Sequence, residues 1–354
     1  MTTIEWTDEV WNPVVGCSRV SAGCEHCYAE RHAHRGMVEA HRGLTVLGKH
    51  GPRWTGEVRC LPERLEQPLR WRKPRRVFVN SMSDLFHESV PYEFIAAVFG
   101  VMAACPQHSF QLLTKRPGVA KAFFLALARI TSNGFGTPAS RALEWCRTRA
   151  ISRGVPPEKL PHHSFIPGVQ WPLPNVWLGV SVEDQESADE RIPLLLDIPA
   201  ALRWVSYEPA IGRVRLEERW LLGHFDHCPV EGLPLGPDGE QFGVDPCEGC
   251  PGWGMECGAI RGHSLDWIVI GGESGPRARS FDIGWARHVI RDCRSAGVPV
   301  FVKQLGSNPC VVRDGPFDIQ LYPLKRALRD RKGGDMSEWP EDLRIRQWPK
   351  GDNR

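Results

Sequence analysis

Three cysteines near the N-terminus, Cys17, Cys24 and Cys27, have the residue type and spacing of metal ligands. Thiolates bind zinc and iron–sulfur clusters, and a two-residue gap such as that between Cys24 and Cys27 lets both side chains reach one centre. Four ligands close a metal site, whereas three leave a coordination position open for chemistry. The spacing therefore predicts either a three-cysteine iron–sulfur cluster or a zinc ion completed by one of the nearby histidines.

A second group of cysteines lies in a segment, residues 223–263, that is rich in glycine and proline and poor in apolar side chains. Such a segment cannot build a core of its own, so a bound metal would staple its fold. The gap between Cys247 and Cys250 is typical of a zinc knuckle, and Cys228 and Cys257 can complete a four-cysteine set. We expect structural zinc here, with an auxiliary iron–sulfur cluster or plain reduced thiols as alternatives.

Length and composition limit the class of protein. The chain has 354 residues, 42% of them apolar, which suits one large domain carrying insertions. Its 44 basic and 42 acidic side chains argue neither for nor against a nucleic-acid partner. We find no signal peptide and no run of eighteen apolar residues, and therefore predict a cytoplasmic protein without a membrane partner. Its twelve cysteines are then expected to be reduced thiols and metal ligands.

Apolar, β-branched runs that could position such ligands recur along the chain, and each ends in polar residues or glycine. Continuous apolar runs are typical of parallel strands buried on both faces. The runs occupy residues 10–15, 75–84, 109–117, 175–184, 202–209, 265–275 and 298–306. Helical patterns lie between several of them, at residues 92–104, 118–128, 183–198 and 282–296. The last has Asp282 as its expected N-cap and Gly297 as its C-cap.

This alternation predicts an α/β fold, a complete or partial parallel (β/α) barrel over residues 1–309. Residues 129–174 interrupt the repeat and could lie over the barrel mouth as a lid. Residues 223–263 form the cysteine-rich, metal-stapled insertion, and residues 310–354 form a charged C-terminal extension that we expect to pack only in part.

Reactive side chains follow the ends of the predicted strands. In barrels the chemistry collects at the carboxyl ends of the strands, so we expect these side chains to share one rim with the first cysteine group. Any one of them alone would be explained as a cap or a loop residue. The set comprises Ser81, Ser83, Asp84, Thr114, Lys115, Ser181, Glu183, Tyr207, Glu208, Glu273, Ser274, Lys303 and Gln304.

Taken together, these motifs resemble the radical S-adenosylmethionine (SAM) superfamily and, within it, the phage-associated three-Cys-motif family. The order of segments is also similar to that of spore photoproduct lyase, a radical SAM enzyme that repairs a DNA lesion. Two features differ from the superfamily pattern. The first cysteine gap has six residues where three are usual, and the Gly-Gly-Glu motif, usual after the second strand, stands at residues 271–273. The resemblance rests on the segments TIEWTDEVWNPVVGCSRVSAGCEHCYAER, VFVNSMSDLFHESVP, LLTKRP, WLGVSVED, WIVIGGESGPRAR and VPVFVKQLG.

The resemblance implies a cofactor set and a reaction. Cys17, Cys24 and Cys27 would hold three irons of a [4Fe–4S] cluster, whose fourth iron would bind SAM. One electron from an external donor such as flavodoxin or ferredoxin would cleave SAM into methionine and a 5′-deoxyadenosyl radical. That radical would abstract a hydrogen atom from the substrate.

The resemblance also suggests a role for each strand end. The residues after the second strand, Ser81, Ser83 and Asp84, would contact the methionine amine or the ribose. Lys115 would pair with the methionine carboxylate, whose charge suits a point cation. Two residues of the fourth strand end, Ser181 and Glu183, would hold the ribose hydroxyls. The side chains expected to face the substrate are Tyr207, Glu208, Glu273, Lys303 and Gln304.

A nucleic-acid base or nucleotide, modified or repaired, is the substrate that the phage association suggests. The basic run at residues 64–76 surrounds Trp71 and could track a phosphate backbone, although a solvated surface is the simpler explanation. Two other functions remain open from the sequence. One is a zinc-dependent hydrolase or nuclease on a barrel, and the other is a metal-stapled nucleic-acid-binding protein without catalysis.

Overall fold

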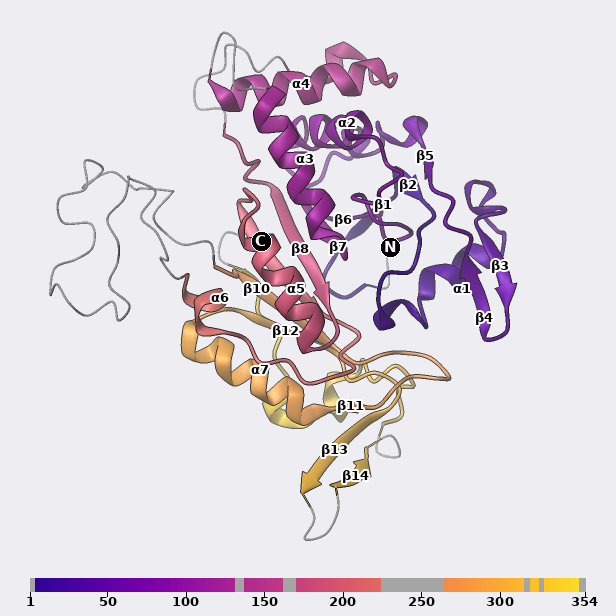
Figure 1. The fold of residues 1–354 in the computed structure, drawn as a ribbon, viewed down its shortest axis with the longest axis vertical. Helices are drawn as coiled ribbons and strands as arrows, with labels where there is room; N and C mark the ends of the chain where they lie inside the picture. The colour runs from indigo at the N-terminus through magenta and orange to yellow at the C-terminus, as the bar shows by residue number, and fades with distance from the viewer. Residues whose placement is uncertain are drawn as a thin grey trace, which may run out of the picture.

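A seven-stranded parallel sheet forms the centre of the protein (Figure 1). The computed structural model describes residues 4–130, 137–161, 170–223, 264–314, 319–324 and 328–349. Neighbours in the sheet follow the order of the chain, and every pairing is parallel. The strands are β1 (Glu9–Trp11), β6 (Arg76–Val79), β7 (Ser109–Thr114), β8 (Val176–Val182), β9 (Leu202–Tyr207), β10 (Trp267–Gly271) and β12 (Val300–Gln304). Within the described residues, the two edge strands β1 and β12 do not pair with each other, so the sheet is a partial barrel. The predicted α/β class is confirmed.

Helices cover one face of this sheet, and all of them except the short α6 lie where the sequence predicts them. They are α2 (Tyr92–Ala103), α3 (Pro117–Ile130), α5 (Gln185–Leu196), the short α6 (Glu218–Leu222) and α7 (Ile283–Ala296). The α7 caps are those expected: the Asp282 carboxylate accepts from the Gly284 amide at 2.9 Å, and Gly297 adopts a left-handed φ of 70°. At α5, Asp184 and Ser187 form a reciprocal capping box.

The opposite, concave face of the sheet is filled by large aromatic side chains. Residues that alternate with the helix-facing ones form a buried cluster containing Trp6, Phe78, Trp177, Trp204, Trp267 and Phe301. Gly179 makes room for it, because a Cβ there would lie 2.5 Å from the Trp204 ring. This packed aromatic cluster forms a floor on the concave face of the sheet.

The first predicted strand divides into two. Pro13 separates β1 from β2 (Val14–Val15), which leaves the parallel sheet and pairs antiparallel with β5 (Arg59–Cys60). Gly16 follows with a φ of 90°, and a Cβ there would lie 2.2 Å from the Glu57 carbonyl oxygen. The chain is thereby turned into the loop, residues 17–27, that carries the first cysteine group; we call it the cysteine loop. Beyond it lie α1 (Tyr28–His34) and the hairpin of β3 (Thr45–Gly48) and β4 (Gly51–Trp54).

The described part of the segment 129–174 belongs to the outer helical layer. Helix α4 (Pro138–Ser152) packs against α2, where a Cβ on Gly100 would lie 2.5 Å from the Cys146 carbonyl oxygen. Figure 1 shows α4 beside α2 and α3, away from α1 and its hairpin. Within its described residues, this segment therefore does not act as the lid that we expected.

The described part of the C-terminal extension packs closely on the sheet. Residues 345–347 run antiparallel along β12, with the Gln347 amide donating to the Val300 carbonyl at 2.9 Å. Next, Trp348 stacks on Trp267 at 5.4 Å between ring centroids, and the Arg76 guanidinium lies 3.8 Å from its ring. The tail therefore covers the free edge of β12 and reaches the start of β6.

Three short strands and several single-turn helices complete the described fold. The strands β11 (Phe281–Asp282), β13 (Pro309–Asp314) and β14 (Ile319–Pro323) form a separate small sheet. The 3-10 helices are η1 (Ala22–Cys24), η2 (Glu39–His41), η3 (Pro62–Arg64), η4 (Pro68–Arg70), η5 (Pro157–Lys159), η7 (Met336–Glu338) and η8 (Glu341–Leu343). Among the described residues, no helix has both the length and the apolar content needed to cross a bilayer.

Candidate functional site

A cavity of about 960 Å³ opens at the carboxyl ends of the parallel strands. Its floor includes Trp6 and Phe78 of the aromatic cluster, and its walls come from the loops that follow the strands. A volume of this size lies at the upper end of the range for small-molecule sites. It is where a (β/α) barrel is expected to carry its chemistry.

All three cysteines of the cysteine loop line this cavity. Cys17, Cys24 and Cys27 are half-buried free thiols, and the charge on each would affect its neighbours. Within the described ranges, no three Cys, His, Asp or Glu side chains converge closely enough to hold one metal ion. A [4Fe–4S] cluster accepts thiolates that are further apart, because each sulfur binds a different iron.

The cysteine loop is held from the β7 and β8 ends of the sheet. After β7, Arg116 donates to the Ser18 carbonyl at 3.0 Å and to the Ser18 hydroxyl at 2.7 Å. After β8, Glu183 lies against Gly23, where a Cβ would meet the Glu183 Cγ at 2.4 Å. Only glycine at position 23 allows this approach without movement of the loop or of Glu183.

The β10 end holds the same loop from the other side. Glu273 accepts from His26 Nδ1 at 3.1 Å and pairs with Arg279 at 2.8 Å. Arg279 in turn donates to the Ala22 carbonyl at 2.9 Å. Burial would raise the pKa of Glu273, but hydrogen bonds from Arg279 and His26 lower it below its usual value. The Glu273 carboxylate therefore stays charged at neutral pH and fixes the loop.

The three thiols have different acidities in the cluster-free protein. Burial, reinforced by Asp84, raises the pKa of Cys17 to about 12, and burial also raises the pKa of Cys27. For Cys24, burial opposes ionisation, but the charge of Lys115 and local hydrogen bonds outweigh it and lower its pKa. Cys24 is therefore the thiol with the largest thiolate fraction near neutral pH.

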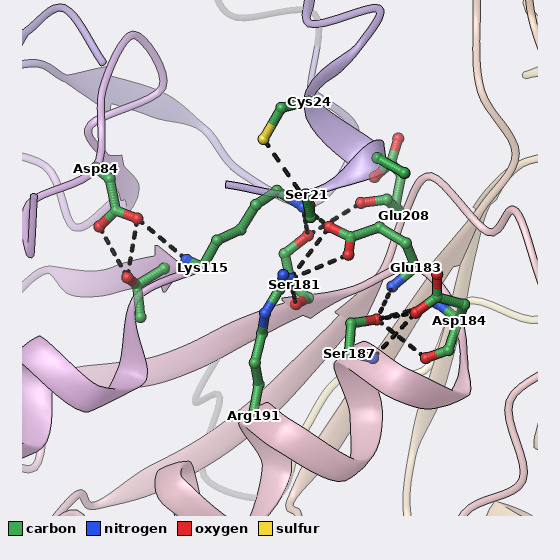
Figure 2. A network of polar contacts seen from close by, with 12 residues as sticks. Ser21, Cys24, Asp84, Lys115, Ser181, Glu183, Asp184, Ser187, Arg191 and Glu208 are labelled. Carbon is green, nitrogen blue, oxygen red and sulfur yellow. Dashed lines mark hydrogen bonds and ion pairs between the residues drawn. The ribbon is translucent and has the colours of Figure 1, made fainter. Parts of the chain in front are cut away.

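A network of ion pairs lies beneath the cysteine loop (Figure 2). Lys115 donates to the Ser181 hydroxyl at 2.8 Å and pairs with Glu183, which Arg191 contacts at 3.1 Å. Burial lowers the pKa of Lys115 to about 8. Asp84 accepts from the Thr114 hydroxyl, from two backbone amides and from Arg116. These contacts join the ends of β6, β7 and β8 into one rigid wall.

Comparison with known families gives one match. The sequence model of a family described as a protein of unknown function (DUF5131) matches residues 1–333. The chain belongs to the DUF5131 family. No curated protein and no solved structure matches it. The family description assigns no activity, so the function must be argued from the site itself.

Most of the strand-end residues singled out from the DUF5131 sequence meet at this cavity. Those that line it are Ser81, Ser83, Asp84, Thr114, Lys115, Ser181, Glu208, Glu273, Ser274, Lys303 and Gln304. Ser83 donates to the Val14 carbonyl at 2.8 Å, and Ser81 to the Asn12 side chain at 3.2 Å. Both hydroxyls thus also tie β6 to the chain that enters the cysteine loop.

Two of the predicted site residues are not among those lining the cavity. Glu183 is buried and bound by Lys115 and Arg191, so its carboxylate is already occupied. The buried phenol of Tyr207 donates to the Gly212 carbonyl. We therefore regard Tyr207 as a support for the loop after β9 and do not retain it as a substrate-facing group.

Glu208 and its neighbours form a second polar group in the cavity wall. Glu208 accepts from Lys303 at 2.7 Å and from Gln304 at 3.2 Å, joining the β9 and β12 ends. Each partner is largely buried, with the Lys303 and Glu208 side chains each 17% exposed. This part of the wall can offer a proton donor and an acceptor to a bound molecule.

The structure adds functional candidates that the sequence analysis did not single out. Asn80 ends β6 with a left-handed φ of 63°, lines the cavity, and is buried with no hydrogen-bond partner for its Nδ2 in the described residues. A left-handed backbone and an unpaired buried donor, on a residue that lines a cavity, are features of a ligand site. The contacts of Arg116 and Arg279 with the cysteine loop were overlooked because they join residues 99 and 257 positions apart.

The remaining predicted ligands lie elsewhere. The second group, Cys228, Cys247, Cys250 and Cys257, lies outside the described residues, so its metal stays a prediction. The basic run at residues 64–76 does not line the cavity. Within it, Arg75 pairs with Glu9 at 2.6 Å and lies over the Trp71 ring at 5.4 Å. Part of that run therefore serves the fold of this DUF5131 protein.

Proposed function

We propose that this protein is a radical SAM enzyme. Cys17, Cys24 and Cys27 would hold a [4Fe–4S] cluster, and SAM would bind beside it in the cavity. The observation that carries the proposal is that three thiols of one loop open into one large cavity at the carboxyl end of a partial (β/α) barrel. The fold, the donor type and the donor number suit a cluster that keeps one iron free for a ligand.

The surroundings of the thiols fit such a cluster. Three thiolates bring negative charge into a half-buried site, and that charge needs compensation. Arg116 lies 3.8 Å from Cys17 Sγ, and the charge of Lys115 acts on Cys24. Contacts of this kind around the ligands orient them and tune the centre.

The cavity also has groups that fit SAM. The unpaired Asn80 amide is a donor for the methionine carboxylate or a ribose hydroxyl, and Lys115 provides a cation nearby. Tyr28 presents a ring that is 53% exposed in the cavity, while its hydroxyl is fixed by the Ser81 carbonyl at 2.7 Å. Such a ring is a surface on which an adenine can stack.

When bound, the cluster and SAM would supply the chemistry, in which one electron would cleave the sulfonium C–S bond of SAM to methionine and a 5′-deoxyadenosyl radical. The protein provides placement and excludes water. The loop contacts of Arg116 and Glu273 fix the thiols, and the aromatic floor below keeps the cavity dry. Glu208 and Lys303 would contact the substrate, for which we propose a nucleic-acid base or nucleotide.

Anaerobic reconstitution with iron and sulfide tests the proposal. We expect a brown protein with a broad band near ~400 nm that dithionite bleaches. The reduced protein should release 5′-deoxyadenosine from SAM. Cys24→Ala should abolish that release, whereas Cys60→Ala, a half-buried free thiol outside the cavity, should not. A colourless protein with stoichiometric zinc at this loop would instead favour a hydrolase.

A further inference from the structure

The cavity mouth carries more positive charge than its acids balance. Deep in the cavity the acids are matched, since Asp84 pairs with Arg116, Glu208 with Lys303 and Glu273 with Arg279. Nearer the tail, the Asp330 carboxylate accepts from backbone amides of its own loop. Of the acids that line the cavity, Glu5 and Asp330 have no ion pair within the described residues.

Four exposed cations from two segments of the chain line the same cavity. Arg31 and Arg35 come from α1 and its C-terminal cap, and Arg331 and Lys332 come from the C-terminal extension. None of the four side chains has an ion-pair or hydrogen-bond partner in the part of the chain that the structure describes. The whole chain has a net charge of only +2, so this concentration of unpaired charge is local.

The loop that carries Arg331 and Lys332 is fixed in place. Ser307 donates to the Arg331 carbonyl at 2.6 Å, and the Leu305 amide to the Gly333 carbonyl at 2.8 Å. The Asp330 carboxylate accepts from the Lys332 amide at 3.0 Å and from the Gly334 amide at 2.6 Å. The backbone is therefore held at the mouth while both cationic side chains remain free.

Arg31 lies beside the loop that carries Arg331, because the Gly275 amide donates to the same Ser307 hydroxyl that donates to the Arg331 carbonyl. A Cβ on Gly275 would lie 3.0 Å from the Arg31 Nη1, so the guanidinium packs on the loop that follows β10. A phosphate group is the ligand class that matches these side chains, because guanidinium groups bind its oxygens in pairs and a lysine adds a point charge. Neutral or cationic substrates would leave the four charges unbalanced.

We propose that this cationic mouth, formed by Arg31, Arg35, Arg331 and Lys332, binds phosphate groups of the substrate. The inference deepens the proposed function by naming a phosphate-bearing substrate. It rests on that function only for the reaction that follows binding. A free nucleotide and a strand of nucleic acid share this chemistry. The four side chains line the same cavity as the thiols, so phosphate groups bound by them would place the rest of the substrate in that cavity.

Equilibrium binding with cluster-free protein tests the inference apart from the radical chemistry. The probes are a fluorescein-labelled single-stranded oligonucleotide of mixed sequence and, as competitors, AMP and inorganic phosphate. We expect Arg331→Glu/Lys332→Glu to raise the oligonucleotide Kd about tenfold or more at low salt, because two phosphate contacts become repulsive. Arg31→Glu/Arg35→Glu should act in the same direction. Each pair should also lower the salt dependence of log Kd by about one to two units.

The matched control is Arg291→Glu/Arg294→Glu, which makes the same charge change at two exposed positions of α7 outside the cavity. Displacement by AMP at concentrations similar to those of the strand identifies a free nucleotide as the source of the phosphate, and displacement only by the strand identifies a nucleic acid. The inference is overturned if both mouth variants bind within about twofold of the parent, or if the control weakens binding equally. The variant Arg331→Gln/Lys332→Gln removes both positive charges without adding acids. It therefore distinguishes a loss of phosphate contacts from misfolding caused by the glutamates. If the protein binds the probes but forms no cluster, the phosphate-binding inference stands and the proposed function is refuted.

Discussion

The Arg116 guanidinium lies 3.8 Å from the Cys17 sulfur, measured from Nη1 to Sγ. Its side chain is only 4% exposed, and it also pairs with Asp84 at 3.3 Å and with Glu88 at 2.9 Å. Solvent screens such a charge weakly. A buried cation beside a cluster ligand stabilises the reduced cluster, which carries one more negative charge than the oxidised one.

Replacing Arg116 by glutamine should therefore lower the reduction potential of the reconstituted cluster, on the order of tens of millivolts. Arg116→Lys, which keeps the charge but loses the fork of donors, should recover part of the loss. The potential is measured by redox titration followed by electron paramagnetic resonance. Asp84→Asn/Arg116→Gln removes both charges and separates the effect on potential from the cost of an unpaired buried carboxylate.

A surface arginine provides the control for this titration. Arg59→Gln removes a guanidinium whose partner, Glu57, is half exposed, so the cluster potential should not change. If Arg116→Gln and Arg59→Gln give the same potential as the parent protein, Arg116 does not influence the cluster.

The unequal acidities of the thiols predict an order of alkylation in the cluster-free protein. The thiolate is the reactive form, so a lowered pKa makes Cys24 react with iodoacetamide at lower pH than Cys17, whose pKa is about 12. The Cys24 rate should reach its plateau at a lower pH than the Cys17 rate. Peptide mass spectrometry of timed samples measures both rates.

The same experiment tests the origin of the effect. Lys115→Met should raise the pKa of Cys24 and slow its labelling at pH 7.5, because the nearby cation is lost. Lys121→Met, which breaks a surface pair with Asp197 at 2.6 Å, should leave the rate unchanged. Faster labelling of Cys17 than of Cys24 at neutral pH would refute this assignment.

Gly23→Ala should damage the site more than the fold. The added methyl group would lie 2.4 Å from Glu183 Cγ, so either the cysteine loop or that buried carboxylate must move. We expect cluster iron to fall several-fold, with a thermal midpoint within a few degrees of the parent. The control, Gly118→Ala, places a methyl group in open space in α3 and should be neutral or slightly stabilising. Full iron content in Gly23→Ala would show that this close approach is dispensable.

The sequence predicted most strands of the sheet and most of its helices, because the residues that determine each element lie within it or directly beside it. Continuous apolar runs mark strands buried on both faces, and Asp282 and Gly297 act on the helix that they flank. The run at residues 10–15 misled the prediction, since β2 leaves the sheet to pair with Cys60, a partner more than forty residues away. The residues next to this run do not indicate that β2 pairs with a distant strand.

The candidate site was predictable only in part, because many of its contacts join residues that are far apart in the sequence. The cysteine spacing and the polar strand ends indicated which residues meet, and the cavity at the carboxyl ends brings most of them together. The contacts that hold the loop are non-local: His26 and Glu273 are 247 residues apart, and Arg116 is 99 residues from Cys17. Whether a cluster and SAM bind there stays a prediction.

The final prediction concerns Trp348, whose ring closes the open side of the partial barrel. It stacks on Trp267 at 5.4 Å, and Arg76 lies over it at 3.8 Å. Trp348→Ala would remove a half-buried ring from both contacts and leave a gap beside the aromatic floor. We expect a loss of about 2–4 kcal/mol in the free energy of unfolding, measured by urea denaturation. Trp348→Phe, which keeps an aromatic ring, should lose less than half of that.

The same variant tests whether the tail protects a sheet edge. With Trp348 gone, residues 345–347 lose their anchor and the backbone groups of β12 become available for pairing with another chain. Light scattering should therefore show faster aggregation of Trp348→Ala than of Trp348→Phe at equal concentration. Unchanged urea midpoints and equal scattering in both variants would mean that β12 is protected by its hydrogen bonds to the tail alone, without help from the ring.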